Sequence, residues 1–467
     1  MAGSMPIGSR KVFMRVTTLF LIFCSLLLGQ KPNVLFIPVD DLNAWVGHLK
    51  AHPNAKTPNI DRLAARGMTF TRAYTPVPAC SPTRAALLTG KRPWTSGVYV
   101  NEQQWYPTLK STTSLPQHFM KSGYQVMGGG KIFHNGIPGH TVPNYWHEYY
   151  TRKADPSAPQ KPTFSRGKFA FGPLLNISET EMPDYKLVTW ASEKLKKQHS
   201  KPFFLAVGII KPHLPWFVPK KYFDRFPLNS IQRPPNRPDD LNDIPSLGVK
   251  MALRFGDHAA ILQKSAWEKA IQAYLANISF VDDQIGRLLD ALDNGPNKNN
   301  TIIVFWGDHG WSLGEKRHWR KFALWEEATR APLIFVVPGQ VNPGSRCDTP
   351  IDFMSIYPTL TDLAGISTPA HVEGNSLAPL LHNPAAGWSH PAISTHGGGN
   401  HAVRSGGWRY IRYSNGTEEL YNRYSDPNEW NNLASDPSTA GTRVALRNLL
   451  PTHEATPVRD VVSENKD

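Results

Sequence analysis

Cysteine is scarce in this chain, which has 3 cysteines among 467 residues. Cys24 lies in an apolar run near the N-terminus, so only Cys80 and Cys347 remain for the rest of the chain. Two cysteines could form one bridge or act separately, but they do not make the disulfide framework that stabilises small secreted proteins. The hydrophobic content of 40% is instead sufficient for a sizeable core, and it excludes a disordered chain.

The apolar run at the N-terminus is short. It spans residues 19–28, which is too few to cross a bilayer comfortably, so we predict no stable membrane span. The run follows Arg10, Lys11 and Arg15 and ends at Gly29, a pattern typical of a secretory signal. We therefore predict that residues 1–30 are a signal peptide and that the protein is exported to the periplasm, secreted or, in a eukaryote, lysosomal. An uncleaved N-terminal anchor is the alternative.

Acidic residues are fewer than basic ones: Asp+Glu 37 against Lys+Arg 51 gives a net charge of +14. This excess favours a polyanionic partner, such as nucleic acid, an anionic glycan or an acidic surface. The basic residues form no run of five or six, and no nucleic-acid-binding motif is present, so we predict no nucleic-acid partner. A solvated basic surface without a specific role is the alternative.

Apolar strands alternate with helices along most of the chain. The pattern predicts buried strands at 33–39, 202–209, 301–306 and 331–337, and helices at 57–64, 259–292 and 356–364. This alternation predicts an α/β fold with a large, mixed, mostly parallel sheet and helices on both faces. The Pro- and Arg-rich stretch 211–248 is too long for an ordinary connection, so we expect a loop region near a site or a mobile insertion.

The pattern changes near residue 390. Segments 402–413 and 418–421 alternate polar and apolar residues, with the turn signal Asn415-Gly416 between them. We predict a small antiparallel subdomain there. The predicted organisation is therefore a signal peptide at 1–30, a catalytic domain at 31–389 and a C-terminal antiparallel subdomain at 390–467.

Two predicted strands end in residues that bind metals. Asp40 and Asp41 follow the first strand, and Asp308 and His309 follow the strand 301–306. Ligands in open parallel sheets bind beyond the carboxyl ends of the strands. Carboxylates with one imidazole suit a hard divalent cation such as Ca²⁺ or Mg²⁺. An isolated Asp-Asp pair would otherwise be a helix cap or a turn.

A second candidate feature is the segment 79–90. Ser81 is a suitable N-cap and Pro82 a suitable first helical residue, which places Cys80 at the N-terminus of a helix. Backbone N–H groups at that end favour an anion, and Arg84 can direct its forked donors at the same anion. Cys80 is thus a candidate nucleophile, whereas a buried cysteine beside a capped helix is the alternative.

These residues resemble a known family. The segment Cys80-Ser-Pro-Thr-Arg84 resembles the sulfatase signature Cys-x-Pro-x-Arg. Other motifs of the family follow in order over nearly the whole mature chain, at 40–41, 57–63, 307–314, 418–421 and 426–430. The resemblance implies an alkaline-phosphatase-like fold and a Cys80 that a formylglycine-generating enzyme converts to formylglycine.

The resemblance also implies a site. One calcium ion, with Mg²⁺ less favoured, would be bound by Asp40, Asp41, Asp308, His309 and the modified Cys80. The other implied catalytic residues are Arg84, Lys131, His134, His213 and Lys321. In the family's mechanism hydrated formylglycine attacks sulfur, and the cationic residues hold the sulfuryl oxygens. His213, alone or together with Lys321, protonates the leaving oxygen. His134 would help to restore the aldehyde. Without the resemblance, Gly128–Gly130 would be a turn or a weak phosphate-loop signal, His213 structural and Lys321 a solvated charge.

The substrate is suggested by local motifs. The segments 131–134 and 211–215, with the imidazole at 309, resemble iduronate-2-sulfatase-type enzymes, which implies removal of O-sulfate from a sugar unit of an acidic glycan. The basic net charge agrees with such a substrate. The segment 319–322 departs from that subgroup, so an algal galactan or ulvan unit stays open. Core packing is the default expectation for four aromatic residues in predicted loops, and stacking on sugar faces is the alternative: Trp105, Tyr106, Trp216 and Trp319.

Two other functions remain as alternatives. A phosphonate monoester or phosphodiester hydrolase can share the fold and the nucleophile signature. A non-catalytic glycan-binding protein would leave Cys80 unmodified.

Overall fold

The computed structural model of this protein describes residues 31–103, 105–134, 145–156, 163–164 and 169–459. The predicted signal peptide at 1–30 lies outside these residues. Within the described ranges, no helix has both the length and the apolar character needed to cross a membrane.

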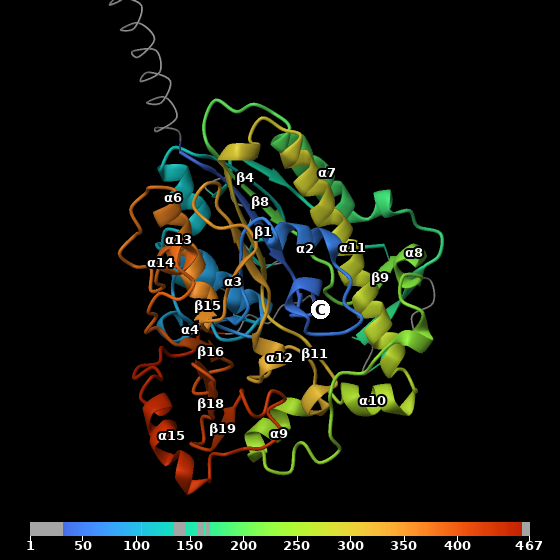
Figure 1. The fold of residues 1–467 in the computed structure, drawn as a ribbon, viewed down its shortest axis with the longest axis vertical. Helices are drawn as coiled ribbons and strands as arrows, with labels where there is room; N and C mark the ends of the chain where they lie inside the picture. The colour runs from blue at the N-terminus through green and yellow to red at the C-terminus, as the bar shows by residue number, and fades with distance from the viewer. Residues whose placement is uncertain (1–30, 104, 135–144, 157–162, 165–168, 460–467) are drawn as a thin grey trace, which may run out of the picture.

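A central sheet of eight strands organises the molecule (Figure 1). Its order is β14 (Ser345–Cys347), β2 (Met68–Phe70), β13 (Leu333–Val336), β10 (Thr301–Gly307), β1 (Asn33–Val39), β8 (Phe203–Gly208), β4 (Gln125–Gly130) and β5 (Glu148–Tyr150). The strands β10, β1, β8, β4 and β5 run parallel, whereas β13 is antiparallel to both of its neighbours. The sheet is therefore mixed and mostly parallel, as the sequence predicts.

Helices cover both faces of this sheet, with α7 (Pro183–Leu195) and α11 (Trp267–Asp293) on one face and α3 (Cys80–Thr89) and α13 (Ile356–Leu363) on the other (Figure 1). Alternate residues of β1 enter two separate cores: Leu35 and Ile37 pack on the α11 side, and Val34 and Phe36 on the α3 side. A strand covered on both faces must be apolar throughout, which explains its continuous hydrophobic run. The prediction of helices on both faces is confirmed.

The predicted single helix at 259–292 is wrong. The structure has two helices there, α10 (Asp257–Gln263) and α11. Ser265 lies between them with φ = 47°, in the left-handed region that interrupts a right-handed helix. Ile261 and Trp267 are both buried in the same core, so the apolar spacing continues across the break and hides it from the sequence.

The stretch 211–248 is more regular than the predicted loop. It contains β9 (Trp216–Pro219), the short helix α8 (Lys220–Phe223) and the start of α9 (Ser246–Ala252). Strand β9 pairs in parallel with β7 (Phe169–Leu174), and its residues are buried. The segment does lie near the candidate site, since it contains His213, and residues 231–245 have no helix or strand. The prediction of a loop is wrong for residues 216–223, which backbone pairing and burial fix.

The C-terminal region forms the predicted antiparallel sheet. Its strands follow one another as β16 (Ala392–Thr395), β17 (His401–Ser405), β18 (Trp408–Arg412) and β19 (Glu418–Asn422). The buried Arg409 of β18 joins this sheet to the rest of the protein, because its guanidinium lies 2.5 Å from a carboxylate oxygen of Glu326. The exact domain boundary at residue 390 remains a prediction.

The glycines 128–130 form neither a turn nor a phosphate-binding loop. They are the end of β4, which pairs with β8. Gly130 has φ = 77°, and a Cβ atom added there would lie 2.1 Å from the backbone oxygen of Gly208. Glycine therefore permits both the left-handed backbone and the close approach of the two strands.

We expect Gly130→Ala to lower the free energy of unfolding by about 2–4 kcal/mol, because the new methyl group adds a backbone clash to the left-handed strain. Urea titration would measure this change. Gly123→Ala is the matched control, since Gly123 has φ = 89° and nothing lies within 4 Å of an added Cβ. We expect the control to lose about 1 kcal/mol. Equal losses in the two variants would contradict the proposed clash.

Candidate active site

Cys80 is the first residue of α3 and is fully buried. The N-cap is Ala79, and the backbone N–H of Ser81 donates to the side-chain oxygen of Asn101 at 3.0 Å. The prediction that Ser81 caps this helix is therefore wrong, because Asn101 supplies the acceptor from a distant loop. Cys80 and Cys347 are both free, so the possible bridge between them does not form.

The acidic residues converge because the strands before them are neighbours. Strands β1 and β10 run parallel with Val39 opposite Gly307, so the residues that follow lie at the same edge of the sheet. The N–H of Asp41 donates to Asp308 Oδ1 at 2.9 Å, and the hydroxyl of Tyr274 donates to the backbone oxygen of Asp41 at 2.7 Å. Asp41 has φ = 58°, a strained backbone conformation that these contacts hold in place.

The thiol of Cys80 lies at the centre of this group. Its sulfur is 2.9 Å from Lys321 Nζ and 3.3 Å from His309 Nε2. Asp41 Oδ1 is 3.7 Å from the same sulfur and 2.7 Å from Lys321 Nζ. An ammonium group, an imidazole and a carboxylate thus meet at one buried side chain.

Arg84 lies one turn into α3 and holds two of the acids. Its Nε donates to Asp308 Oδ2 at 3.0 Å, and its terminal nitrogen donates to Asp40 Oδ1 at 3.2 Å. Arg84 also donates to the backbone oxygens of Lys131 and Ile132. Lys131 Nζ lies 2.5 Å from Asp40 Oδ2, so each oxygen of that carboxylate has a cationic partner. Charges buried in this way are tolerated only when paired.

The two remaining histidines of the predicted site are both partly buried. The side chain of His213 is 34% exposed; its Nδ1 lies 2.6 Å from the backbone oxygen of Leu214, and its Nε2 is 3.9 Å from Asp41 Oδ2. His134 is half-buried, and its Nδ1 has no hydrogen-bond partner among the described residues. The charges of Lys131 and Asp40 both act on His134. The structure thus brings all ten residues of the predicted site into one neighbourhood.

Burial and charge shift the pKa values in this group. Burial, helped by the carboxylates of Asp40 and Asp41, raises the pKa of Asp308 to about 7 against the opposing effect of Arg84. Burial and the charge of Lys321 lower the pKa of His309 to about 3, so its imidazole is neutral. Since His309 Nδ1 lies 2.9 Å from the backbone oxygen of Gly310, its Nε2 is left with a free lone pair.

These side chains fit a divalent cation. Ligand atoms of two overlapping sets lie within 4.8 Å of one another: Asp40, Asp41, Cys80 and His213, and Asp40, Cys80, Asp308 and His309. The Oδ2 atom of Asp41 is buried and has no hydrogen-bond partner among the described residues, although a buried carboxylate oxygen normally has one. An oxygen-rich set with a neutral imidazole is suitable for a hard metal ion.

Two supporting residues were not predicted from the sequence. Tyr274 fixes the backbone of Asp41, and the hydroxyl of Thr83 donates to the backbone oxygen of Asp308 at 3.3 Å. Tyr274 lies within the buried stripe of α11, where it is indistinguishable from a core residue. Thr83 occupies a variable position of the Cys80–Arg84 motif, so the motif itself gives no signal for it.

Core packing, the default expectation, is confirmed for three tryptophans, and the alternative of sugar stacking is wrong for them. Trp105, Trp216 and Trp319 are only 1%, 0% and 2% exposed. They belong to α5 (Trp105–Leu109), β9 and β12 (Trp319–Arg320) rather than to loops, and they pack in the cores. Tyr106 is half-buried, and its role remains a prediction.

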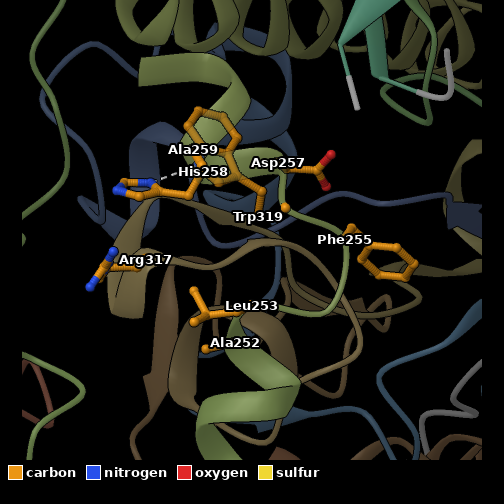
Figure 2. A pocket seen from close by; sticks show the side chains of 9 residues that line it. Ala252, Leu253, Phe255, Asp257, His258, Ala259, Arg317 and Trp319 are labelled. Carbon is orange, nitrogen blue, oxygen red and sulfur yellow. Dashed lines mark hydrogen bonds between the residues drawn. The ribbon is translucent and has the colours of Figure 1, made fainter. Parts of the chain in front are cut away.

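Trp319 lines a cavity of about 210 Å³ together with Phe255, His258 and Arg317 (Figure 2). None of the predicted site residues lines this cavity. It is therefore separate from the group around Cys80.

Comparison with known proteins decides the family. The sulfatase family model matches residues 32–366, and the model of the C-terminal part of N-sulphoglucosamine sulphohydrolase matches residues 314–455. The chain belongs to the sulfatase family. The first match includes every predicted catalytic and metal-binding residue of this sulfatase.

Relatives of this sulfatase span most of its length. It is 44% identical to a protein of Formosa agariphila named sulfatase, over 91% of this chain and 88% of the relative. It is 32% identical to iduronate 2-sulfatase of Homo sapiens, over 72% of this chain and 70% of the relative. Phosphonate monoester hydrolase of Agrobacterium radiobacter has a similar structure, with a TM-score of 0.75, 22% identity and coverage of 89% of this chain and 94% of that one. At that identity, the likeness supports the fold alone.

Proposed function

We propose that this sulfatase removes O-sulfate from a sugar unit of a sulfated glycan or oligosaccharide. The observation that carries the proposal is the position of Cys80, whose buried sulfur touches Lys321 Nζ beside a set of oxygen ligands. The similarity to iduronate 2-sulfatase supports a sugar substrate, and the net charge of +14 suits a polyanionic one. An iduronate-type preference is the finer part of the same proposal.

Formylglycine made from Cys80, and one Ca²⁺ ion, are the proposed active groups. Burial and the nearby Asp40 carboxylate raise the pKa of the Cys80 thiol well above its usual value, so the unmodified residue is a poor nucleophile at neutral pH. Hydrated formylglycine would supply a nucleophilic hydroxyl, and calcium would supply charge stabilisation. Asp40, Asp41 and Asp308 would hold the ion together with His309.

The chain's own cations would bind the sulfuryl group. Lys321 Nζ is 2.9 Å from the sulfur of Cys80, so its ammonium group could donate to an oxygen of a sulfate ester bound at residue 80. Arg84 and Lys131 belong to the same buried group, where Arg84 pairs with Asp40 and Asp308 and Lys131 pairs with Asp40. Fixed cations of this kind stabilise charge that spreads over the sulfuryl oxygens as the S–O bond breaks.

The histidines would move protons. The Nδ1 of His213 is held against the backbone oxygen of Leu214, which leaves Nε2 of this partly exposed side chain to protonate the departing sugar oxygen. Burial lowers the pKa of His134 well below its usual value, so its ring is neutral, and its Nδ1, which has no partner among the described residues, would accept a proton as the aldehyde is restored.

Export is part of the proposal. The basic and apolar segments within residues 1–30 support a signal peptide and therefore an exported enzyme.

A desulfation panel tests this function. Enzyme whose residue 80 has been checked by mass spectrometry is incubated with defined sulfated oligosaccharides and with matched phosphonate esters. We expect sulfate release from at least one sugar sulfate, at a higher rate than phosphonate cleavage. Failure of formylglycine-containing enzyme to release sulfate from any ester would refute the proposal, and faster phosphonate cleavage would support the phosphonate hydrolase alternative.

We expect His213→Ala to lower kcat by about 10²–10⁴ on a sugar sulfate, because an alkoxide leaves poorly without a proton. The loss on 4-nitrophenyl sulfate should be much smaller, since nitrophenolate leaves without protonation. Initial rates on the two esters give the comparison. His199→Ala is the control, because His199 contacts Gln125 and Lys194 and lies outside the site. Equal losses on both esters would exclude the general-acid role.

A further inference from the structure

Three distant segments form a corner beside Lys321. Arg254 follows α9, Phe322 follows β12, and His396 follows β16. The Phe322 ring joins them: its centroid lies 5.6 Å from Lys321 Nζ, 5.5 Å from the guanidinium carbon of Arg254 and 5.9 Å from the centroid of the His396 ring. We call Arg254, Phe322 and His396 the Arg254 corner. Its middle residue, Phe322, directly follows Lys321, whose ammonium group contacts Cys80.

Arg254 is an exposed cation with unused donors. Its guanidinium lies 5.1 Å from the Phe255 ring and 5.5 Å from the Phe322 ring. Within the described part of the chain it makes no hydrogen bond or ion pair. The neighbouring Arg320 differs, since its nitrogens lie 2.6 and 3.1 Å from the two carboxylate oxygens of Asp257. Aromatic faces thus orient Arg254 and leave its N–H groups available to an anion.

His396 supplies a polar group that lacks a partner. It is 6% exposed, and its Nδ1 has no hydrogen-bond partner among the described residues. Burial and the charge of Arg254 lower the pKa of His396 to about 3, so the ring is neutral and Arg254 carries the charge of the corner. A buried ring nitrogen without a partner is costly, which favours a ligand that provides one.

The backbone fixes the corner to the Cys80 loop. Phe322 has φ = 72°, a conformation that costs free energy for a bulky residue. Its N–H donates to the backbone oxygen of Pro78 at 3.0 Å, two residues before Cys80. His396 is held by hydrogen bonds in both directions with Asn400, at 3.0 Å each. The distance from residue 80 to the corner is therefore set by short, defined contacts.

We propose that the Arg254 corner binds a second anionic group, a carboxylate or a further sulfate, on the sugar that carries the cleaved ester. This inference rests on the proposed function and deepens it. Arg254 forms the charged contact and His396 a hydrogen bond, while the Phe322 ring lies next to both Arg254 and Lys321. The corner favours sugars with two anionic groups over sugars in which the sulfate ester is the only charged group. A sugar without the second anionic group leaves Arg254 and His396 without partners.

The variant Arg254→Gln tests the Arg254 corner through the ratio of the kcat/KM values for different substrates. Three sugar sulfates with the ester at one position are compared: one with a carboxylate, one with a second sulfate and one otherwise neutral. We expect the kcat/KM ratio of an anionic to the neutral sugar to fall by about 10- to 100-fold, the range for a hydrogen-bonded charged contact. The anion that the corner binds is identified by which kcat/KM ratio falls: that of the sugar with a carboxylate, that of the sugar with a second sulfate, or both.

Arg317→Gln is the matched control. Arg317 is also exposed and makes no side-chain ion pair within the described ranges, and Figure 2 places it across the cavity from Phe255. Its substitution should leave the ratios unchanged. If the kcat/KM ratios were unchanged in Arg254→Gln, the proposed role of the Arg254 corner would be overturned, even if the variant released sulfate normally. The absence of turnover on every sulfate ester, including 4-nitrophenyl sulfate, by the unaltered enzyme would instead overturn the proposed function.

Discussion

Cys80→Ala is expected to lower sulfate-ester turnover by at least about 10³-fold, because it removes the residue from which the nucleophile is made. No other group can replace it, since Lys321, His309 and Asp41 all direct their polar atoms at this one side chain. Rates of sulfate release, with mass spectrometry of the peptide containing residue 80, measure the effect. The variant should still fold, because alanine keeps the helix start at α3.

Cys347→Ala gives the control for this variant. Cys347 is also free and buried, but it ends β14, and its sulfur lies 3.6 Å from the backbone oxygen of Pro384. We expect this variant to retain full turnover with a similarly small change in unfolding midpoint. If the Cys80→Ala enzyme kept its rate, residue 80 would not be the nucleophile.

Residues that follow strands could be located from the sequence. Asp40 and Asp308 were predicted to meet because parallel neighbouring strands present their carboxyl ends at one edge, and β1 and β10 do pair in this way. The apolar runs were sufficient to identify these strands, since both faces of the sheet are covered. Lys131, His213 and Lys321 came only from the family resemblance, because a lone lysine or histidine carries no local signal.

The errors share a physical cause, which is long-range packing. Asn101 caps α3 in place of Ser81 through a contact 20 positions along the chain. Trp216 and Trp319 are buried because Phe169 packs its ring against both, at 5.0 and 5.6 Å. Local propensity describes neither contact. Likewise, the left-handed Ser265 ends α10 without interrupting the apolar spacing on which the single-helix prediction depended.

Asp308→Asn is expected to weaken calcium binding by at least about tenfold and to lower turnover with it. The change removes one negative charge from the group that Arg84 and the metal would share, while the amide keeps one oxygen acceptor and nearly the same volume. Arg84 Nε now lies 3.0 Å from Asp308 Oδ2, so the variant leaves that guanidinium less well neutralised. Calcium content after dialysis, and turnover against added Ca²⁺, measure the two effects.

Asp282→Asn is the control for Asp308→Asn. It shows which effects come from loss of the metal and which come from neutralising any buried carboxylate. Asp282 is 1% exposed in α11 and accepts hydrogen bonds from the N–H groups of Asn59 and Ile60, at 3.0 and 2.8 Å. This control should lower the unfolding midpoint but keep its calcium. Excess Ca²⁺ should partly restore turnover of Asp308→Asn, since mass action compensates for weaker binding. An Asp308→Asn enzyme with full calcium content and lost turnover would remove Asp308 from the ligand set and leave it a role in orienting Arg84.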